Sequence, residues 1–593
     1  SPLLPGLLDR IHGFSWIHFY DAIILACSSF GSCSVHVARQ HIDMSSRRRL
    51  HGKQADPRIT NFLAESLPWS AEFLGLHVFR IASLSRRWLR MLNTDVRMLA
   101  SVLSEQVRFS GMPSADAAAR ALFKRLPEYL ACLDLEFGKR YAHGSGHLSD
   151  ETFDLLAGKL PQRLKSIRIG LGYAKAPAAL LAAIVKQATG NLRELRLHAC
   201  MPRDAFQVLV GGLPQSLTKL SLELVPGQEC QEFPEQADLG LLAQRLPSSL
   251  VQLSLGLGGL VWDGLLEDLA RRMPALRQLE RLSLDLRQGD IESPGIKALL
   301  DGLPIWLTSL DLNLGSNDLD PLCVTHAFRH VLRSLSNLEE LRLDFEECEI
   351  GCTLPGCIAR GLPISLVELS LEFGGCDLTN EAVQEVCQAM AAQVGLQKLS
   401  LSFRACNVAG GVAELGQHMP PNLVSLSLNF FNSDIGDDDA VAVARSLPSS
   451  LKALDLSFGG CSLMTAVCMQ RWFESLPGCL RELKLEFEWL SLSQVTSICL
   501  PRRLEAFDLH ANALYSGHKG NSPILKALAI GLRELLALRK LRLDFGMCDL
   551  SLRQARRIMQ SLPSAISHAD LDFGGCVTAQ DTEEKWKQLL GAA

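Results

Sequence analysis

The stretch LVELSLEFGGCDL, residues 366–378, sets the pattern for most of this chain. Its frame, LxxLxLxFxxCxL, returns as LQKLSLSFRACNV at 396–408, LKALDLSFGGCSL at 451–463 and LRKLRLDFGMCDL at 538–550. With the second leucine-class residue as the register position, about sixteen copies follow one another, spaced by about 29 residues. The register positions are 133, 167, 195, 220, 253, 282, 310, 341, 369, 399, 426, 454, 483, 507, 541 and 569. Repetition with a period of about 20–50 residues indicates stacked structural units.

One copy shows what each unit should form. Alternation sends Leu369, Leu371 and Phe373 to one face of a strand, and Ser370 and Glu372 to the other. The residues after the turn have apolar side chains at helical spacing. A strand and a helix side by side are wider than a strand alone. We therefore expect parallel strands on the inner side of a curve, with helices outside.

The 28–29-residue spacing, and a turn position that accepts Cys or Asn, as at Asn317, resemble the ribonuclease-inhibitor type of leucine-rich repeat over about 132–593. This resemblance implies an α/β fold: a right-handed, open solenoid, or horseshoe, with a concave sheet and convex helices. In this chain two extra residues separate the strand leucines from the turn cysteine. They predict a longer or bulged strand.

Six of the 18 cysteines fall seven residues after a register position. They are Cys348, Cys376, Cys406, Cys461, Cys548 and Cys576. A position that also accepts Asn caps backbone groups in a turn, so we expect free thiols and a cytoplasmic or nuclear protein. The local group Cys348, Cys352 and Cys357 has no histidine nearby, so we expect no metal ion. No cofactor is expected either.

Three regions are expected along the chain. Residues 1–56 have no repeat and form a poorly ordered basic leader or fragment region, residues 57–110 a helical segment, and residues 111–593 the leucine-rich-repeat domain. The chain opens on Ser1 and its first methionine is Met44, so whether 1–43 belongs to the mature protein is left open.

The segment 59–96 carries a second resemblance. The run FRIASLSRRW, from Phe79 through Arg86 and Arg87 to Trp88, is similar to the closing helix of an F-box. An F-box followed by leucine-rich repeats implies a substrate adaptor of a cullin-type ubiquitin ligase, docked on an adaptor subunit. The alternative is a helix pair that caps the open hydrophobic end of the solenoid.

Exposed strand positions should carry the function, because the leucines are committed to the core. Each copy has two such positions. Over all copies, thirteen of these positions hold an acidic residue and five hold a basic residue. The candidate partner-binding residues are Asp285, Asp311, Asn313, Asp344, Glu372, Asp455, Glu486, Asp508, Asp544 and Asp572. The densest run is Asp285, Asn313, Asp344 and Glu372 on successive strands. This pattern favours a concave groove that binds a basic protein partner; the alternative is a solvated face that keeps a large surface soluble.

Other classes of function have less support. The chain has no P-loop, GxSxG elbow, HExxH or glycine-rich dinucleotide turn in a suitable context, so we expect a non-enzymatic interaction scaffold. Nucleic-acid or membrane-surface binding would depend on a few basic residues, Arg47–Arg49, Arg86, Arg87 and Arg90, and the acidic concavity opposes both. The expected protein is a monomer.

Overall fold

The computed structural model describes most of the repeat region. The described residues are 120, 123–124, 126, 132–136, 149–161, 163–187, 191–225, 232–488, 495, 497–511, 523–546 and 552–572. They all lie in the second of two units of the chain, Leu74–Ala593. The predicted segments 1–56 and 57–110 lie outside the described residues.

Sixteen strands form one sheet in which each strand pairs in parallel with the next along the chain. They are β1 (Cys132–Glu136), β2 (Ser166–Lys175), β3 (Glu194–Cys200), β4 (Lys219–Leu224), β5 (Gln252–Gly256), β6 (Arg281–Asp285), β7 (Ser309–Asn313), β8 (Glu340–Asp344), β9 (Glu368–Glu372), β10 (Lys398–Ser402), β11 (Ser425–Asn429), β12 (Ala453–Ser457), β13 (Glu482–Glu486), β14 (Ala506–His510), β15 (Lys540–Asp544) and β16 (His568–Asp572).

The register of this sheet is the one that the leucines predict. Leu341 pairs with Leu369, Leu369 with Leu399, and Leu399 with Leu426, and the same row runs from Leu133 on β1 to Ala569 on β16. Each pair joins two register positions of consecutive copies. The predicted count of strands, their direction and their alignment are therefore confirmed.

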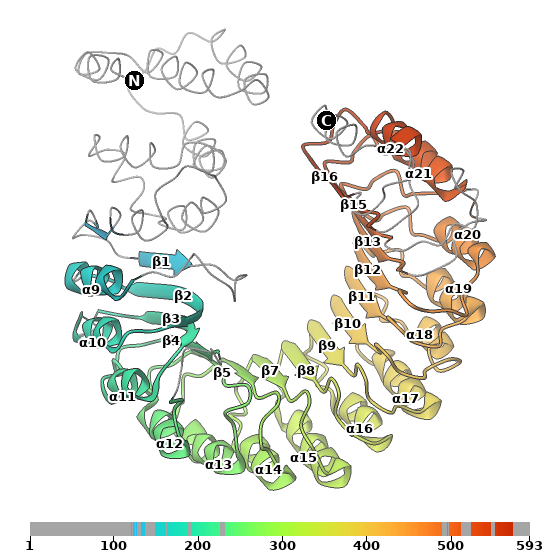
Figure 1. Cartoon of the computed structure of the whole chain (residues 1–593). Coiled ribbons are helices and arrows are strands. Elements are labelled where there is room, and N and C mark those ends of the chain that lie inside the picture. Colours follow the sequence, from blue (N-terminus) through green and yellow to red (C-terminus); the bar gives the residue numbers. More distant parts are fainter. Residues whose placement is uncertain are drawn as a thin grey trace, which may run out of the picture. The chain divides into compact units, whose positions relative to one another are not determined.

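Helices follow most strands and cover the outer side of the curved repeat array, while the strands line its inner side (Figure 1). They are α9 (Asp150–Lys159), α10 (Ala178–Gln187), α11 (Arg203–Gly211), α12 (Gln236–Arg245), α13 (Asp263–Arg272), the 3₁₀ turn η3 (Met273–Ala275), α14 (Ser293–Asp301), α15 (Pro321–Ser334), α16 (Thr353–Gly361), α17 (Asn380–Met390), α18 (Ala413–Gln417), α19 (Asp437–Arg445), α20 (Ala466–Glu474), α21 (Pro523–Arg533) and α22 (Leu552–Met559). The layer order of a leucine-rich-repeat solenoid is confirmed.

The core lies between the sheet and the helices. Leu369, Leu371 and Phe373 are completely buried, as predicted. The phenylalanine position of the frame forms a continuous stack through six copies, with neighbouring ring centroids 5.7–6.3 Å apart. Its members are Phe345, Phe373, Phe403, Phe430, Phe458 and Phe487. These rings bind each repeat to the next, so the core is continuous along the array.

The prediction of a longer or bulged strand is wrong for β5–β16, which have five residues each. The extra residues form a turn. The residue six positions after the register leucine lies in this turn and has positive φ, 59° at Glu347 and 71° at Gly375. Hydrogen bonds between copies still continue through this turn, from Gly375 N–H to the Arg404 carbonyl at 2.7 Å. Longer strands occur near the start of the described array: β2 has ten residues and a register shift against β3, β3 has seven residues and β4 has six.

The turn cysteines cap the preceding copy, as the Cys/Asn exchange predicts. The Sγ atoms of Cys348, Cys376, Cys406 and Cys461 each donate to a carbonyl oxygen of the copy before, at 3.0–3.1 Å. In the same position, Asn317 donates its Nδ2–H to the Leu286 carbonyl at 3.1 Å. These four cysteines are free thiols. Cys200 on β3 is disulfide-bonded, so the expectation of free thiols does not extend to every cysteine. Cys548 and Cys576 lie outside the described residues.

Candidate functional site

The ten predicted partner-binding residues all lie on the inner face of the sheet, in two rows. Asp285, Asn313, Asp344 and Glu372 stand side by side on β6–β9, as predicted. The next three members of this row are uncharged, Ser402, Asn429 and Ser457 on β10–β12. Glu486, Asp544 and Asp572 follow on β13, β15 and β16, with His510 between the first two. Asp311, Asp455 and Asp508 belong to the second row. The candidates thus form two groups and not one stripe. The central group is Asp285, Asp311, Asn313, Asp344 and Glu372, and the C-terminal group is Asp455, Glu486, Asp508, Asp544 and Asp572.

The central group is more enclosed than the strand pattern predicts. Ser370 and Glu372 are half-buried, where alternation predicts exposed side chains, because strands about 4.8 Å apart shield each other's side chains on a concave sheet. Neither side chain points into the core, so the predicted register stands. Asp311, Asp344 and Asp285 are half-buried in the same way.

This enclosure raises the pKa of three carboxyl groups in the central group. Burial raises the pKa of Asp344, and the charges of Glu346 and Asp285 raise it further. Burial also raises the pKa of Glu372, with the charges of Asp344 and Glu346 adding to it. Burial likewise raises the pKa of Asp311, although the Ser283 hydroxyl donates a hydrogen bond to it at 3.1 Å. Asp285, Asp344, Glu346 and Glu372, here called the central acidic cluster, therefore repel one another's negative charge.

Arginines partly offset this charge, and the strand pattern alone does not predict them. Arg287 forms an ion pair with Asp285 at 2.7 Å, and Arg404 pairs with Glu346 at 3.0 Å. These arginines and Glu346 occupy the fifth position after the register leucine, beyond the strand. If the alternation of inward and outward side chains is continued two residues beyond the strand, it predicts these three residues on the concave face. Asp285 is thus a paired group, and the unpaired charge is centred on Asp344 and Glu372.

Part of the acidic row has a local structural role. Asp344 Oδ1 accepts the backbone N–H of Glu346 at 2.9 Å, and Asn313 and Asn429 accept N–H groups two residues on in the same way, at 3.0 Å. Asp544 does the same for Gly546 at 3.0 Å. Such caps at a strand end use either Asp or Asn. The capping explains a polar side chain in this row, but it does not require a negative charge.

The C-terminal group is interleaved with basic side chains. Asp455 on β12 pairs with Lys484 on β13 at 3.1 Å. His510 lies between two of the candidates: its Nε2 is 3.1 Å from Asp508 Oδ1 and its Nδ1 is 3.5 Å from Asp544 Oδ2. Glu486 is half-buried and Asp572 is exposed. A cationic partner would gain less here, because Lys484 already offsets the charge of Asp455 and the His510 ring occupies the space between Asp508 and Asp544.

The strands are parallel and aligned by their leucines, a helix follows most of them, and Cys or Asn caps the turn in five described copies. Sequence comparison adds a relative. The chain is 28% identical over 342 residues to the ribonuclease inhibitor of Mus musculus, covering 53% of this chain and 68% of that protein. The repeat region is a ribonuclease-inhibitor-type leucine-rich-repeat solenoid. No protein-family model matches the chain.

Two solved structures resemble the solenoid more distantly. One is the complex of Rad7 and Elc1 from yeast, with a TM-score of 0.33 and 18% identity, covering 67% of this chain and 92% of that one. The other is an internalin from Listeria monocytogenes, with a TM-score of 0.30 and 14% identity, covering 77% and 95%.

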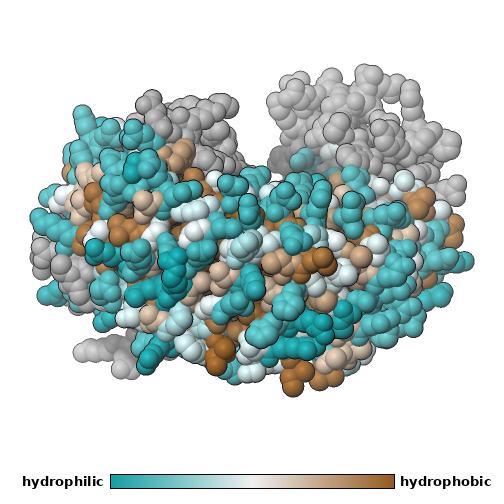
Figure 2. Space-filling view, turned by 90° about the horizontal axis from the view of Figure 1, so that it is seen from below, coloured by the Kyte–Doolittle hydropathy of each residue, from teal (hydrophilic) through white to brown (hydrophobic). Residues whose placement is uncertain are grey.

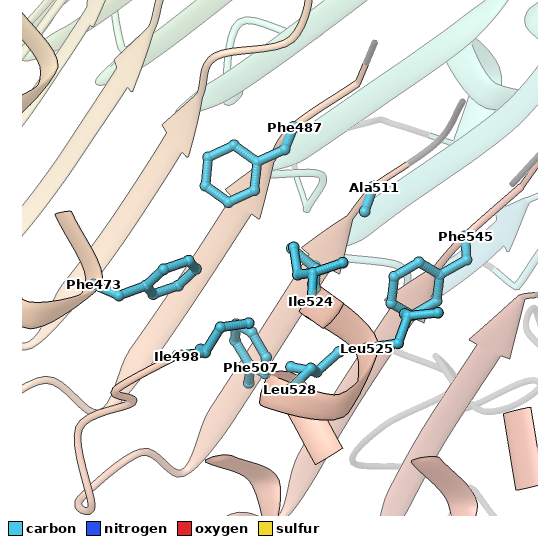
Figure 3. Close-up of a pocket in the computed structure, with 10 residues that line it drawn as sticks. Phe473, Phe487, Ile498, Phe507, Ala511, Ile524, Leu525, Leu528 and Phe545 are labelled. Atoms are coloured by element: carbon cyan, nitrogen blue, oxygen red, sulfur yellow. The ribbon is translucent and has the colours of Figure 1, made fainter. Parts of the chain in front are cut away.

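A small cavity lies in the core of the described repeats. The cavity in Figure 3 lies where Phe473, Ile498 and Leu528 approach the β13–β15 part of the sheet, and all of its lining side chains are apolar. It has a volume of about 10 Å³, roughly the space of one water molecule. It is a packing defect of the core, not a ligand site.

The described surface outside the concave site shows no single large apolar region on the face drawn in Figure 2. The face seen in Figure 2 is largely hydrophilic, with separate hydrophobic patches. Isolated apolar side chains such as Leu322 and Ile364, 75% and 83% exposed, are ordinary on a protein surface. In the described part of the chain, no three His, Cys, Asp or Glu side chains converge as metal ligands. Among the same residues, no helix is both long and apolar enough to cross a bilayer.

The F-box-like residues Phe79, Arg86, Arg87 and Trp88 lie outside the described residues. The choice between an F-box and a cap at 59–96 therefore stays a prediction.

Proposed function

We propose that this solenoid is a protein-interaction scaffold that holds a partner with a basic surface on its concave face, centred on the central acidic cluster. The observation that carries the proposal is the pair Asp344 and Glu372. Both carboxyl groups are half-buried, burial raises the pKa of both, and the charge of Asp344 adds to the rise at Glu372. Perturbed carboxyl groups gathered on an accessible inner surface are typical of functional sites.

The energetic argument is that these charges cost stability when the face is empty. Like charges on neighbouring strands are destabilising, and two arginines beside the cluster, Arg287 and Arg404, are already paired with Asp285 and Glu346. A Lys or Arg of a partner that approached Asp344 and Glu372 would offset their repulsion. The same field would also draw a basic partner to the concavity before contact.

An aromatic side chain supports contact beside the cluster. Phe431 follows β11 and is half-buried, with the Arg404 guanidinium 6.0 Å from its ring centroid. Arg404 thus links the cluster, through Glu346, to an aromatic surface. Aromatic residues and arginine are both enriched at the centres of protein interfaces.

Capture of partners by the immobilised full chain tests this proposal. Wild-type protein and the Asp344→Asn/Glu372→Gln variant would be exposed to the same lysate, and retained proteins quantified by mass spectrometry. The matched control is Glu267→Gln/Asp268→Asn on the outer helix α13, which removes the same charge elsewhere. Proteins retained by wild type and control, lost from the variant and basic in composition support the proposal. Equal retention by all three proteins would contradict it.

A role as a ubiquitin-ligase adaptor remains a second proposal, based on the F-box-like run Phe79–Trp88 alone. Its test is Trp88→Ala. For an F-box this change should remove co-purifying ligase subunits and leave the solenoid folded, whereas for a cap it should lower the melting temperature. If wild-type protein recovers no ligase subunit, the adaptor role is excluded.

A further inference from the structure

The last two described helices present an exposed face that is strongly basic. On α21, Lys526, Ile530 and Arg533 are exposed at helical spacing, and on α22, Arg553, Arg556 and Arg557 are exposed. Neither helix contains an acidic residue. The two helices pack against each other on the outer side of the array (Figure 1). The C-terminal basic face is the set Lys526, Arg533, Arg553, Arg556 and Arg557, with Ile530 among them.

Cations on several other outer helices are paired with acidic side chains. Arg271 on α13 pairs with Glu267 of the same helix at 3.3 Å, and Arg360 on α16 pairs with Glu385 on α17 at 2.7 Å. In the described part of the chain, none of the five cations of the C-terminal basic face has an ion-pair partner. The nearest acid in sequence, Glu534, pairs with Arg502 at 3.2 Å. A single-sign field of this kind is avoided on most surfaces unless it attracts a ligand.

We propose that the C-terminal basic face binds an acidic protein segment that carries an apolar anchor residue. This site is separate from the concave face and goes beyond the proposed function, because it takes a partner of the opposite charge. The four arginines suit carboxylates, since a guanidinium can donate two parallel hydrogen bonds to one carboxylate. Ile530, 62% exposed and flanked by Lys526 and Arg533, provides the apolar contact.

The composition of the face favours a polypeptide over other polyanions. Sites for single-stranded nucleic acids combine basic residues with aromatic side chains on which bases stack, and α21 and α22 contain no aromatic residue. Surfaces that bind anionic membranes insert several large apolar side chains, whereas Ile530 is the one exposed large apolar residue among the side chains of α21 and α22 whose burial the structure describes. Acidic side chains around one aliphatic residue match both features of the face.

The test is a fluorescence-anisotropy titration of the full chain with a labelled acidic peptide, in which glutamates flank one central leucine. Arg556→Glu/Arg557→Glu should weaken binding at least about tenfold, since two attractive contacts become repulsive. Ile530→Ser should weaken it less, by about threefold, and a peptide with serine for the leucine should remove that difference. Affinity should fall as salt rises past about 0.15 M.

The matched control is Arg329→Glu/Arg333→Glu on α15, which makes the same charge change at two exposed arginines elsewhere on the outer face. It should leave peptide affinity unchanged, and circular dichroism melting should show that both double variants are folded. If both double variants lost the same peptide affinity, the effect would come from net charge alone and the proposal would be overturned. Unchanged affinity in the α22 variant would also overturn it, as would tighter binding of a single-stranded oligonucleotide or of phosphatidylserine vesicles that depends on Arg556 and Arg557.

Discussion

The Sγ atom of Cys376 lies 3.1 Å from the carbonyl oxygen of Phe345, so the turn of one copy is capped by the thiol of the next. Cys406 repeats this contact with Phe373, and Ser433 repeats it with Phe403 at 2.6 Å. A thiol and a hydroxyl therefore serve the same purpose in successive copies. The cap depends on a short donor at this position and on no disulfide.

Substituting Cys376 should separate its donor role from its volume. Cys376→Ala removes the donor from a buried site and should lower the free energy of unfolding by about 1–2 kcal/mol. Cys376→Ser keeps a donor, as Ser433 does naturally, and should cost less than about 1 kcal/mol. Urea denaturation measures both values. An alanine variant as stable as wild type would mean that the thiol does not contribute a cap.

Thiol reactivity should follow burial. Burial raises the pKa of Cys376 to about 12 and of Cys461 to about 11, so both stay protonated at neutral pH. The thiolate is the reactive species, so these two should be labelled only after denaturation, whereas the exposed Cys352 and Cys499 should be labelled in the native protein. Mass spectrometry of native and denatured samples gives the order. Rapid native labelling of Cys376 would contradict its position in the structure.

The buried leucines of the strands should stabilise each copy. Leu371→Ala should lower the free energy of unfolding by about 2–5 kcal/mol, because it opens a cavity under a completely buried side chain. Ser370→Ala, one residue away on the concave face, should change it by less than about 0.5 kcal/mol. Chemical denaturation of the two variants compares the faces of β9 directly. Similar effects from both would mean that the register is wrong.

The central acidic cluster should make stability depend on pH. Because burial raises the pKa of Asp344 and Glu372 in the folded state, the folded protein binds protons more tightly than the unfolded chain. Stability is therefore lost as pH rises from the unfolded pKa, about 4, through the folded values. Asp344→Asn/Glu372→Gln should raise stability at pH 7 by roughly 0.5–1 kcal/mol, and the gain should vanish below about pH 4.

Asparagine is the matched replacement for Asp344, since Asn313 keeps the same strand-end cap to Gly315. Melting of both proteins across this pH range gives the comparison. A variant that is less stable than wild type at pH 7 would show that the carboxylates are favourable in the empty protein, and would remove the energetic argument for a cationic partner.

Much of the fold could be predicted from the sequence because one side chain, the register leucine, is buried in nearly every copy. A slip by one residue would expose Leu371 and bury Glu372, so the pattern admits only one register. The turn was harder to predict. Two extra residues could lengthen a strand or form a loop, and the positive φ at Glu347 is set by hydrogen bonds between copies, not by a glycine.

The site was predicted in position but not in its electrostatics. The strand period places Asp285, Asp344 and Glu372 on one face, yet the pairing of Asp285 with Arg287 depends on a side chain beyond the strand. Likewise, Arg404 forms an ion pair with Glu346, although the two residues lie two copies apart and are separated by 58 positions in sequence. Reach of this kind depends on the curvature and the turn, which the repeat frame does not specify.

The most direct test of the concave site is the affinity of a captured partner for wild type and for Asp344→Asn/Glu372→Gln, measured by isothermal titration calorimetry at salt from about 0.05 to 0.3 M. Two lost charge contacts should weaken binding about tenfold at low salt, and the variant should show a flatter dependence on salt. The Glu267→Gln/Asp268→Asn protein should match wild type. Equal affinity and equal salt dependence in all three proteins would contradict the account, and the central acidic cluster would then be a solvated face of the solenoid.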